Sequence, residues 1–169
     1  IVDAGMREML QEQRDCFYYI TLMNENYAQP DLPAEAHADV LRGCYRFGTY
    51  GPHGAAKKVT LLGSGAILTE VIKAAKLLAD EGIASQVFSV TSWSELARDG
   101  QASEADDAVP FLSQQLAASE GPVIAATDYV RAVPESVRAY VPEGRRYVTL
   151  GTDGFGRSDT RAALRRFFG

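Results

Sequence analysis

The chain has 169 residues, of which 46% are hydrophobic, 23% charged and 9% aromatic, a composition typical of one well-packed globular domain with room for part of a second. The apolar fraction excludes a disordered chain, and no apolar run approaches the roughly 20 residues that a membrane-spanning helix needs. Seventeen basic and 22 acidic residues give a formal charge of −5, which argues against a general nucleic-acid binder.

The N-terminal part of the chain differs in pattern from the rest. Apolar side chains at helical spacing predict a helix over 1–12, and an aromatic and β-branched run predicts a buried strand over 17–22. Two prolines three residues apart then indicate a linker. We therefore expect residues 1–35 to be the end of one domain with its linker, and residues 36–169 to be a second domain.

The second part alternates short apolar strands with helices. Helices are predicted over 34–42, 67–81, 94–98, 111–118, 135–140 and 160–168, with Asp159 as the cap of the last one. Strands are predicted over 44–50, 59–62, 86–90, 122–127 and 147–150. This alternation predicts a three-layer α/β/α fold with a mostly parallel five-stranded sheet. The strand over 44–50 has no crossover helix after it, so we expect it to be an antiparallel edge.

Several residues and motifs that could form a functional site are better explained by a structural role. The turn over 63–65 joins a strand to a helix and could hold an anion, but Leu68 stands where the dinucleotide fingerprint needs glycine, so a packing turn is favoured. His37 and His53 are expected to be exposed, and the polar stretch 99–107 to be a surface loop. The sequence contains no paired metal-ligand motif.

The glycine-rich loop after the last strand is a stronger candidate for a functional site. It places Phe155 between two glycines, beside Asp153 and Arg157, at the carboxyl end of a strand, where open α/β sheets bind ligands or partners. Asp128 and Tyr129 follow another strand end and are expected to lie beside it. Two interpretations remain open here: a docking contact with another domain or a second subunit, and a local packing turn with Phe155 folded back.

Five stretches of the sequence, in chain order, resemble one family: YYITLMNENYAQP, LLGSGAIL, VFSVTSWSELARDGQ, VIAATDYVR and YVTLGTDGFGRSDTRAALRRFF. They are similar to the C-terminal part of the homodimeric pyruvate dehydrogenase first component, the thiamine-diphosphate decarboxylase of the bacterial complex. The resemblance implies that residues 1–35 end a pyrimidine-binding domain. It also implies that residues 36–169 form a transketolase-type C-terminal domain with a five-stranded mixed sheet. The apolar end Phe167-Phe168-Gly169 separately predicts that the C-terminal tail of this domain is missing.

The resemblance further implies which cofactors and partners the intact protein has. It would bind thiamine diphosphate and Mg²⁺, form a homodimer in the cytoplasm and acetylate the lipoyl group of dihydrolipoyl acetyltransferase, with no nucleic-acid or membrane partner. The family's GDG motif is not found in this chain, and its catalytic glutamate and pocket histidines belong to upstream sequence. We therefore assign no catalytic, cofactor-binding or metal-binding residue here, and expect the segment alone to be inactive.

Asn24 and Glu25 are candidates for the substrate channel. Sugar-phosphate transketolases carry a phosphate-binding arginine in the corresponding loop, and Asn24 in its place favours an unphosphorylated 2-oxo acid such as pyruvate. Asn24 as a simple turn cap remains an alternative. Two rival functions also stay open, namely another 2-oxo acid substrate and a free-standing binding or regulatory module. Cys16 and Cys44 are expected to be free thiols in a reducing cytosol.

Overall fold

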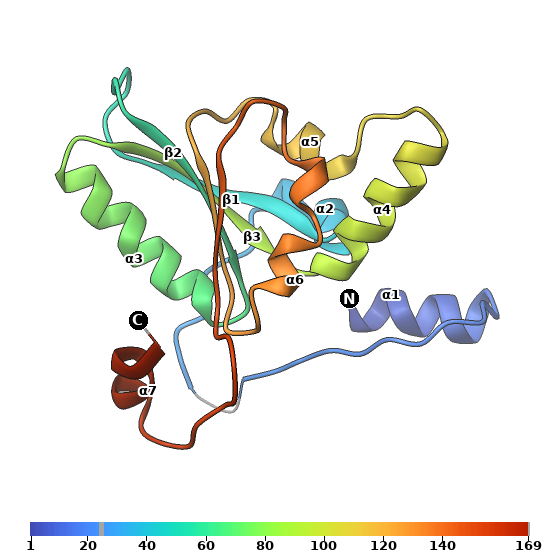
Figure 1. Cartoon of the computed structure of the whole chain (residues 1–169). Coiled ribbons are helices and arrows are strands. Elements are labelled where there is room, and N and C mark those ends of the chain that lie inside the picture. Colours follow the sequence, from blue (N-terminus) through green and yellow to red (C-terminus); the bar gives the residue numbers. More distant parts are fainter. Residues whose placement is uncertain (24–25, 169) are drawn as a thin grey trace.

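The computed structural model of the chain describes residues 1–23 and 26–168, and its centre is one sheet of five strands (Figure 1). The strands are β1 (Cys44–Tyr50), β2 (Lys58–Ser64), β3 (Ala84–Val90), β4 (Val123–Ala126) and β5 (Tyr147–Leu150). Their spatial order is β1-β3-β2-β4-β5. Strand β1 runs antiparallel to β3, and the other neighbouring pairs are parallel. The predicted mixed sheet with one antiparallel edge strand is therefore confirmed.

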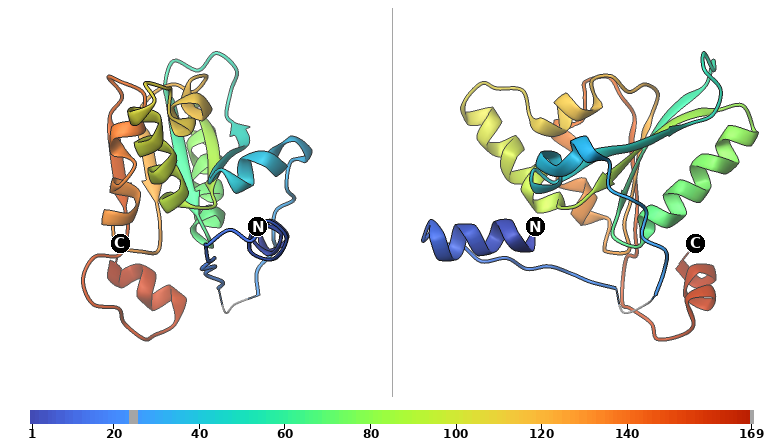
Figure 2. Two further views of the ribbon diagram at one scale, coloured as in Figure 1. Left: turned by 90° about the vertical axis from the view of Figure 1, so that its right-hand side faces the viewer. Right: turned by 180° about the vertical axis from the view of Figure 1, so that it is seen from behind.

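Helices cover both faces of this sheet (Figures 1 and 2). One face carries α3 (Ile67–Asp80). The other carries α4 (Trp93–Ala105), α5 (Phe111–Leu116), α6 (Ala132–Glu135) and the 3-10 turn η3 (Arg138–Tyr140). Near the β1 edge lie the 3-10 turn η2 (Ala34–Ala36) and α2 (His37–Leu41), in agreement with the helix predicted over 34–42. This arrangement confirms the three-layer α/β/α prediction.

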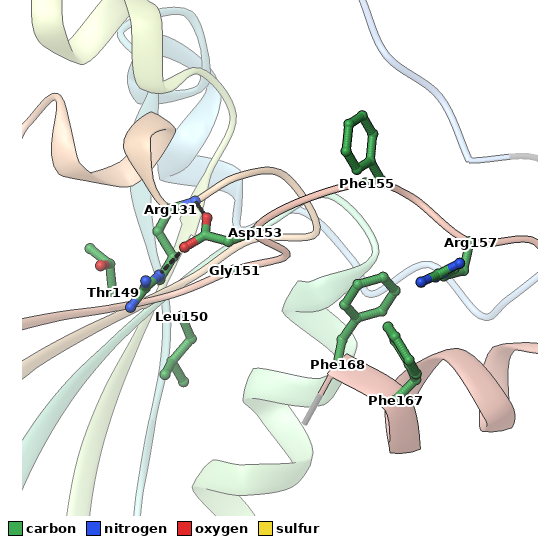
Figure 3. A pocket seen from close by; sticks show the side chains of 9 residues that line it. All are labelled: Arg131, Thr149, Leu150, Gly151, Asp153, Phe155, Arg157, Phe167 and Phe168. Carbon is green, nitrogen blue, oxygen red and sulfur yellow. Dashed lines mark hydrogen bonds and ion pairs between the residues drawn. The ribbon is translucent and has the colours of Figure 1, made fainter.

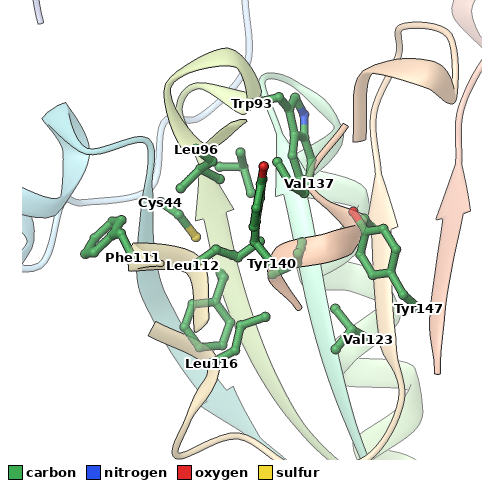
Figure 4. Packing of buried hydrophobic residues seen from close by; sticks show 14 residues of the cluster. Cys44, Trp93, Leu96, Phe111, Leu112, Leu116, Val123, Val137, Tyr140 and Tyr147 are labelled. Atoms are coloured by element: carbon green, nitrogen blue, oxygen red, sulfur yellow. The ribbon is translucent and has the colours of Figure 1, made fainter. Parts of the chain in front are cut away.

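Each face of the sheet has its own apolar core, because neighbouring side chains of a strand point to opposite faces. Leu61 and Val87 pack with Val71 and Ala75 of α3. Leu62, next to Leu61 in β2, faces the larger core instead. Figure 4 shows that core between the sheet and helices α4 to α6. It comprises Cys44, Leu62, Phe88, Val90, Trp93, Leu96, Phe111, Leu112, Leu116, Val123, Ala125, Val137, Tyr140 and Tyr147.

Helix α4 is longer than the sequence pattern predicts. A short helix over 94–98 followed by an acidic surface loop over 99–107 was expected, but α4 continues to Ala105. The Ser92 side chain caps its start by accepting a hydrogen bond from the Glu95 N–H at 3.1 Å. Gly100 is buried inside α4 and packs against the Tyr140 ring, although glycine disfavours a helix. The loop prediction is therefore wrong, because tertiary packing overrides the low helix propensity of this stretch.

The N-terminal segment confirms one prediction and contradicts another. Helix α1 (Val2–Met6) continues into a π-helical turn, η1 (Arg7–Gln11), as expected for residues 1–12. The buried strand predicted over 17–22 is not formed: this stretch has no sheet assignment, and Phe17 and Leu22 are both 87% exposed. A strand needs neighbouring strands for its backbone hydrogen bonds, and the described part of the chain offers none to this stretch.

The last helix, α7 (Arg161–Phe168), lies beyond the carboxyl edge of the sheet, apart from the main body (Figure 1). Its first turn is capped by Thr160, whose Oγ1 accepts from the Ala163 N–H at 3.3 Å. The Asp159 carboxylate instead accepts from the Thr160 N–H, at 2.6 Å, so the predicted cap is displaced by one residue. Within residues 1–23 and 26–168, no helix has the length and apolar character needed to cross a bilayer.

Candidate functional site

The carboxyl ends of β2, β4 and β5 meet at one edge of the sheet because these strands are parallel. Polar contacts join the three ends. The Ser64 hydroxyl donates to Thr127 Oγ1 at 3.0 Å, and the Tyr129 N–H donates to the same oxygen at 3.2 Å. The Thr127 N–H in turn donates to the Leu150 carbonyl at 3.1 Å. The two loops that follow β4 and β5 therefore start from a fixed common base.

An ion pair joins these two loops. The Arg131 N–H donates to Asp153 Oδ1 at 3.0 Å, and the Arg131 Nε–H donates to Oδ2 at 2.6 Å. The backbone hydrogen bond from Arg131, followed by that from its guanidinium, lowers the pKa of the Asp153 carboxyl. Asp153 is thus an ionised partner of Arg131, and its role here is to hold the β5 loop against the β4 loop.

Glycine at position 151 lets the two loops approach closely. A Cβ atom there would lie 2.6 Å from the Tyr129 carbonyl oxygen, so no larger residue fits without moving the backbone. The same carbonyl accepts from the Thr152 N–H at 2.8 Å. The start of the β5 loop is therefore held by backbone contacts as well as by the ion pair.

Phe155 lies on the far side of this anchored base and is 95% exposed. The preceding Gly154 has φ +91°, a conformation that favours glycine and that turns the chain outward. Figure 3 shows the ring standing clear of the other labelled side chains. The interpretation of a turn with Phe155 folded back is therefore wrong for this structure. Farther along, the Arg157 guanidinium lies 5.2 Å from the Phe167 ring centroid, a cation–π contact.

These loops and α7 border an open hollow of about 630 Å³ (Figure 3). Its lining comprises Arg131, Thr149, Leu150, Gly151, Asp153, Phe155, Arg157, Phe167 and Phe168. Its one carboxylate, Asp153, is already engaged by Arg131. Magnesium requires several oxygen ligands, and the described residues contain no group of three or more His, Cys, Asp or Glu side chains that could hold a metal. The lining therefore does not fit a magnesium-bound diphosphate.

The structure brings together some of the residues singled out from the sequence. Thr152, the neighbour of Asp153, donates its N–H to the Tyr129 carbonyl, and Asp128, next to Tyr129, is exposed. Phe155 and Arg157 follow on the same loop. Whether these five residues contact another domain or subunit stays a prediction. Asn24 and Glu25 lie outside the described residues.

Other candidates from the sequence have structural roles. A Cβ at Gly63 would lie 2.9 Å from Val71 Cγ2, so the turn over 63–65 serves close packing of β2 on α3. His37 and His53 are exposed, as expected. The ion pair of Arg131 was not predicted, although a cation five residues after the end of β4 is a usable signal. Its partner is 22 residues away in the chain, which local patterns do not link.

Comparison with known proteins gives two family matches that follow each other along the chain. Residues 1–30 match the family model of the pyruvate dehydrogenase E1 component middle domain, and residues 43–169 match that of the transketolase-like TK C-terminal domain. The pyruvate dehydrogenase E1 components of Cupriavidus necator and Pseudomonas aeruginosa are both 46% identical over 99% of this chain. That of Escherichia coli strain K12 is 44% identical over the same share.

The chain spans about a fifth of the length of these curated relatives, 20% of each. Among solved structures, a transketolase from Campylobacter jejuni aligns with a TM-score of 0.53 and 21% sequence identity. The alignment covers 78% of this chain and 17% of that one. At this level of identity the likeness supports the fold alone, and it agrees with the five-stranded mixed sheet described above.

Proposed function

The chain belongs to the family of transketolase-like TK C-terminal domains, and on that premise we propose that it is the C-terminal portion of a pyruvate dehydrogenase E1 component. The observation that carries the proposal is the order of the two family matches. The match to the pyruvate dehydrogenase E1 component middle domain over 1–30 precedes the match to the transketolase-like TK C-terminal domain over 43–169. The same order supports a division into the end of a middle domain with its linker, 1–35, and a C-terminal domain, 36–169.

In this proposal the intact protein is a cytoplasmic homodimer that decarboxylates pyruvate with thiamine diphosphate and Mg²⁺. It then reductively acetylates the lipoyl group of dihydrolipoyl acetyltransferase: the lipoyl disulfide takes up the two electrons released as the two-carbon fragment becomes an acetyl group, which one of its sulfurs then carries. The cofactor supplies the stabilisation of negative charge that decarboxylation requires. Domains that precede this segment would hold the cofactor, since the hollow at the carboxyl edge does not fit it. Two free thiols, Cys16 and Cys44, are in keeping with a reducing compartment.

The role proposed for this segment is to support the domains that carry out the chemistry. The loops joined by Arg131 and Asp153 present exposed side chains at the carboxyl edge of the sheet. We assign contacts with another domain or subunit to Asp128, Tyr129, Asp153, Phe155 and Arg157. Asn24 and Glu25 are assigned to the mouth of the substrate channel, where an uncharged amide suits an acid without a phosphate group.

The test uses the full-length protein and a purified lipoyl domain. Incubation with pyruvate, thiamine diphosphate and Mg²⁺ is expected to add an acetyl group to the lipoyl domain, detected as a mass increase. A sugar phosphate is expected to give no product. Parallel reactions with 2-oxobutyrate measure the preference among 2-oxo acids. If the full-length protein acylates the lipoyl domain with no 2-oxo acid, the proposal is contradicted.

The 169-residue chain provides the matching control. We expect it to turn over no pyruvate and to give no magnesium-dependent isotherm with thiamine diphosphate in calorimetry. Turnover by this chain alone would contradict the role proposed for it. A reading frame that starts just before Ile1 would favour the rival function, a free-standing binding or regulatory module.

A further inference from the structure

The exposed ring of Phe155 has no role in the main body of the domain, and we propose that it docks onto the middle domain of its own chain. This inference rests on the function proposed above, because it requires a middle domain N-terminal to this segment. It goes further by choosing between the two partners left open, another domain and a second subunit.

The first argument is that the ring is presented on a firmly anchored loop. The Arg131–Asp153 ion pair, the Thr152–Tyr129 backbone hydrogen bond and the close approach at Gly151 fix the start of the loop. A loop whose start is already fixed loses less conformational entropy on binding than a free segment would. Aromatic side chains of this kind are typical anchors of protein interfaces.

The second argument is that Phe155 is one of several exposed apolar side chains at the same edge. Tyr129 is 50% exposed, Leu150 53% and Phe167 63%, and Leu150 and Phe167 line the same hollow as Phe155. Grouped apolar side chains on a surface, bordered here by Arg131 and Arg157, mark interaction sites.

The third argument identifies the partner by its place in the fold. Residues 1–23, which belong to the middle-domain match over 1–30, lie on the carboxyl side of the sheet, the side from which the β5 loop projects (Figures 1 and 2). In that segment Phe17 and Tyr19 are 87% and 83% exposed. Only residues 31–33 separate the middle-domain match from η2, and they span at most about 11 Å, so the middle domain stays close to this domain.

Tethering favours the same chain over a second copy, and charge favours a contact between the two segments. A short linker keeps an attached domain at an effective concentration in the millimolar range. Residues 1–23 carry four acidic and two basic side chains, whereas residues 151–168 carry two acidic and four basic ones. The two segments therefore have formal charges of −2 and +2, and their attraction aids the proposed contact.

The experiment is photocrosslinking in the full-length protein, with Phe155 replaced by p-benzoyl-phenylalanine. Irradiation is expected to join position 155 to a middle-domain peptide while the denatured protein keeps the mass of one chain. The matched control carries the same group at Leu77, which is 68% exposed on α3, and is expected to crosslink several-fold less. A product with the mass of two chains, or a yield at position 155 no higher than at position 77, would overturn the inference.

A second measurement keeps the test independent of the photoreactive group. Phe155→Ala in the full-length protein is expected to lower the unfolding temperature more than Leu77→Ala does. Crosslinking does not depend on turnover, so the two proposals can fail separately. A crosslink to the middle domain in a protein without pyruvate activity would support this inference and contradict the proposed reaction. Pyruvate activity without that crosslink would support the reaction and contradict this inference.

Discussion

Glycine is required at position 100 because another side chain fills the space that a larger residue would need. Gly100 lies within α4, where glycine costs about 1 kcal/mol relative to alanine. A Cβ atom at this position would overlap the ring of Tyr140, which is only 7% exposed in the larger core. The space above Gly100 is therefore filled by that ring, which joins η3 to α4.

We expect Gly100→Ala to lower the free energy of unfolding by about 1–3 kcal/mol, because the overlap outweighs the gain in helix propensity. Urea unfolding of the 169-residue chain measures this. Gly156→Ala is the matched control, since no heavy atom lies within 4 Å of its added Cβ, and it is expected to change stability little. A more stable Gly100→Ala variant would show that the Tyr140 ring does not occupy this space.

At the scale of elements, Glu135 connects α6 and η3 to the edge strand β5. Its carboxylate accepts from Arg138 Nε at 2.6 Å and Nη2 at 2.7 Å, and from the Thr149 hydroxyl at 2.5 Å. The Arg138 hydrogen bonds, followed by that from Thr149, lower the pKa of Glu135 from 4.5 to about 2. The contact therefore stabilises the fold only while Glu135 is ionised.

Because the folded-state pKa is lowered, this contribution is fully present above the unfolded pKa and is lost as the pH falls toward about 2. Denaturant midpoints measured between about pH 5 and pH 2 are expected to fall less steeply in Glu135→Gln than in the parent chain. Thr149→Val removes one of the two partners and should give an intermediate slope. Equal slopes in all three proteins would contradict this role for Glu135.

At the scale of the whole molecule, a packed body carries two exposed aromatic segments, one near each end of the chain. Phe17 and Tyr19 are 87% and 83% exposed, and Phe155 is 95% exposed. Chymotrypsin acting on the 169-residue chain is therefore expected to cut first at these two places, leaving the residues between them intact. Mass spectrometry of the early fragments measures this.

Cleavage at both places is expected to be slower in the full-length protein, because the middle domain would bury both segments. Equally fast cleavage in the two proteins would mean that these aromatic side chains stay exposed in the longer chain. Early cuts within the sheet would contradict the packing described here.

The sequence by itself determined the five strands, the antiparallel edge and most of the helices between them, because their patterns depend on residues close together in the chain. The helix predicted over 135–140 was displaced: the structure has α6 over Ala132–Glu135 and the 3-10 turn η3 over Arg138–Tyr140. Only the tertiary structure decided that α4 runs through Gly100, where a distant ring replaces a side chain, and that Arg131 reaches Asp153, 22 residues away. It also left residues 17–22 outside any sheet, although their pattern is typical of a strand. A pattern records what a segment tends to form, but a strand exists only where partners for its backbone are present.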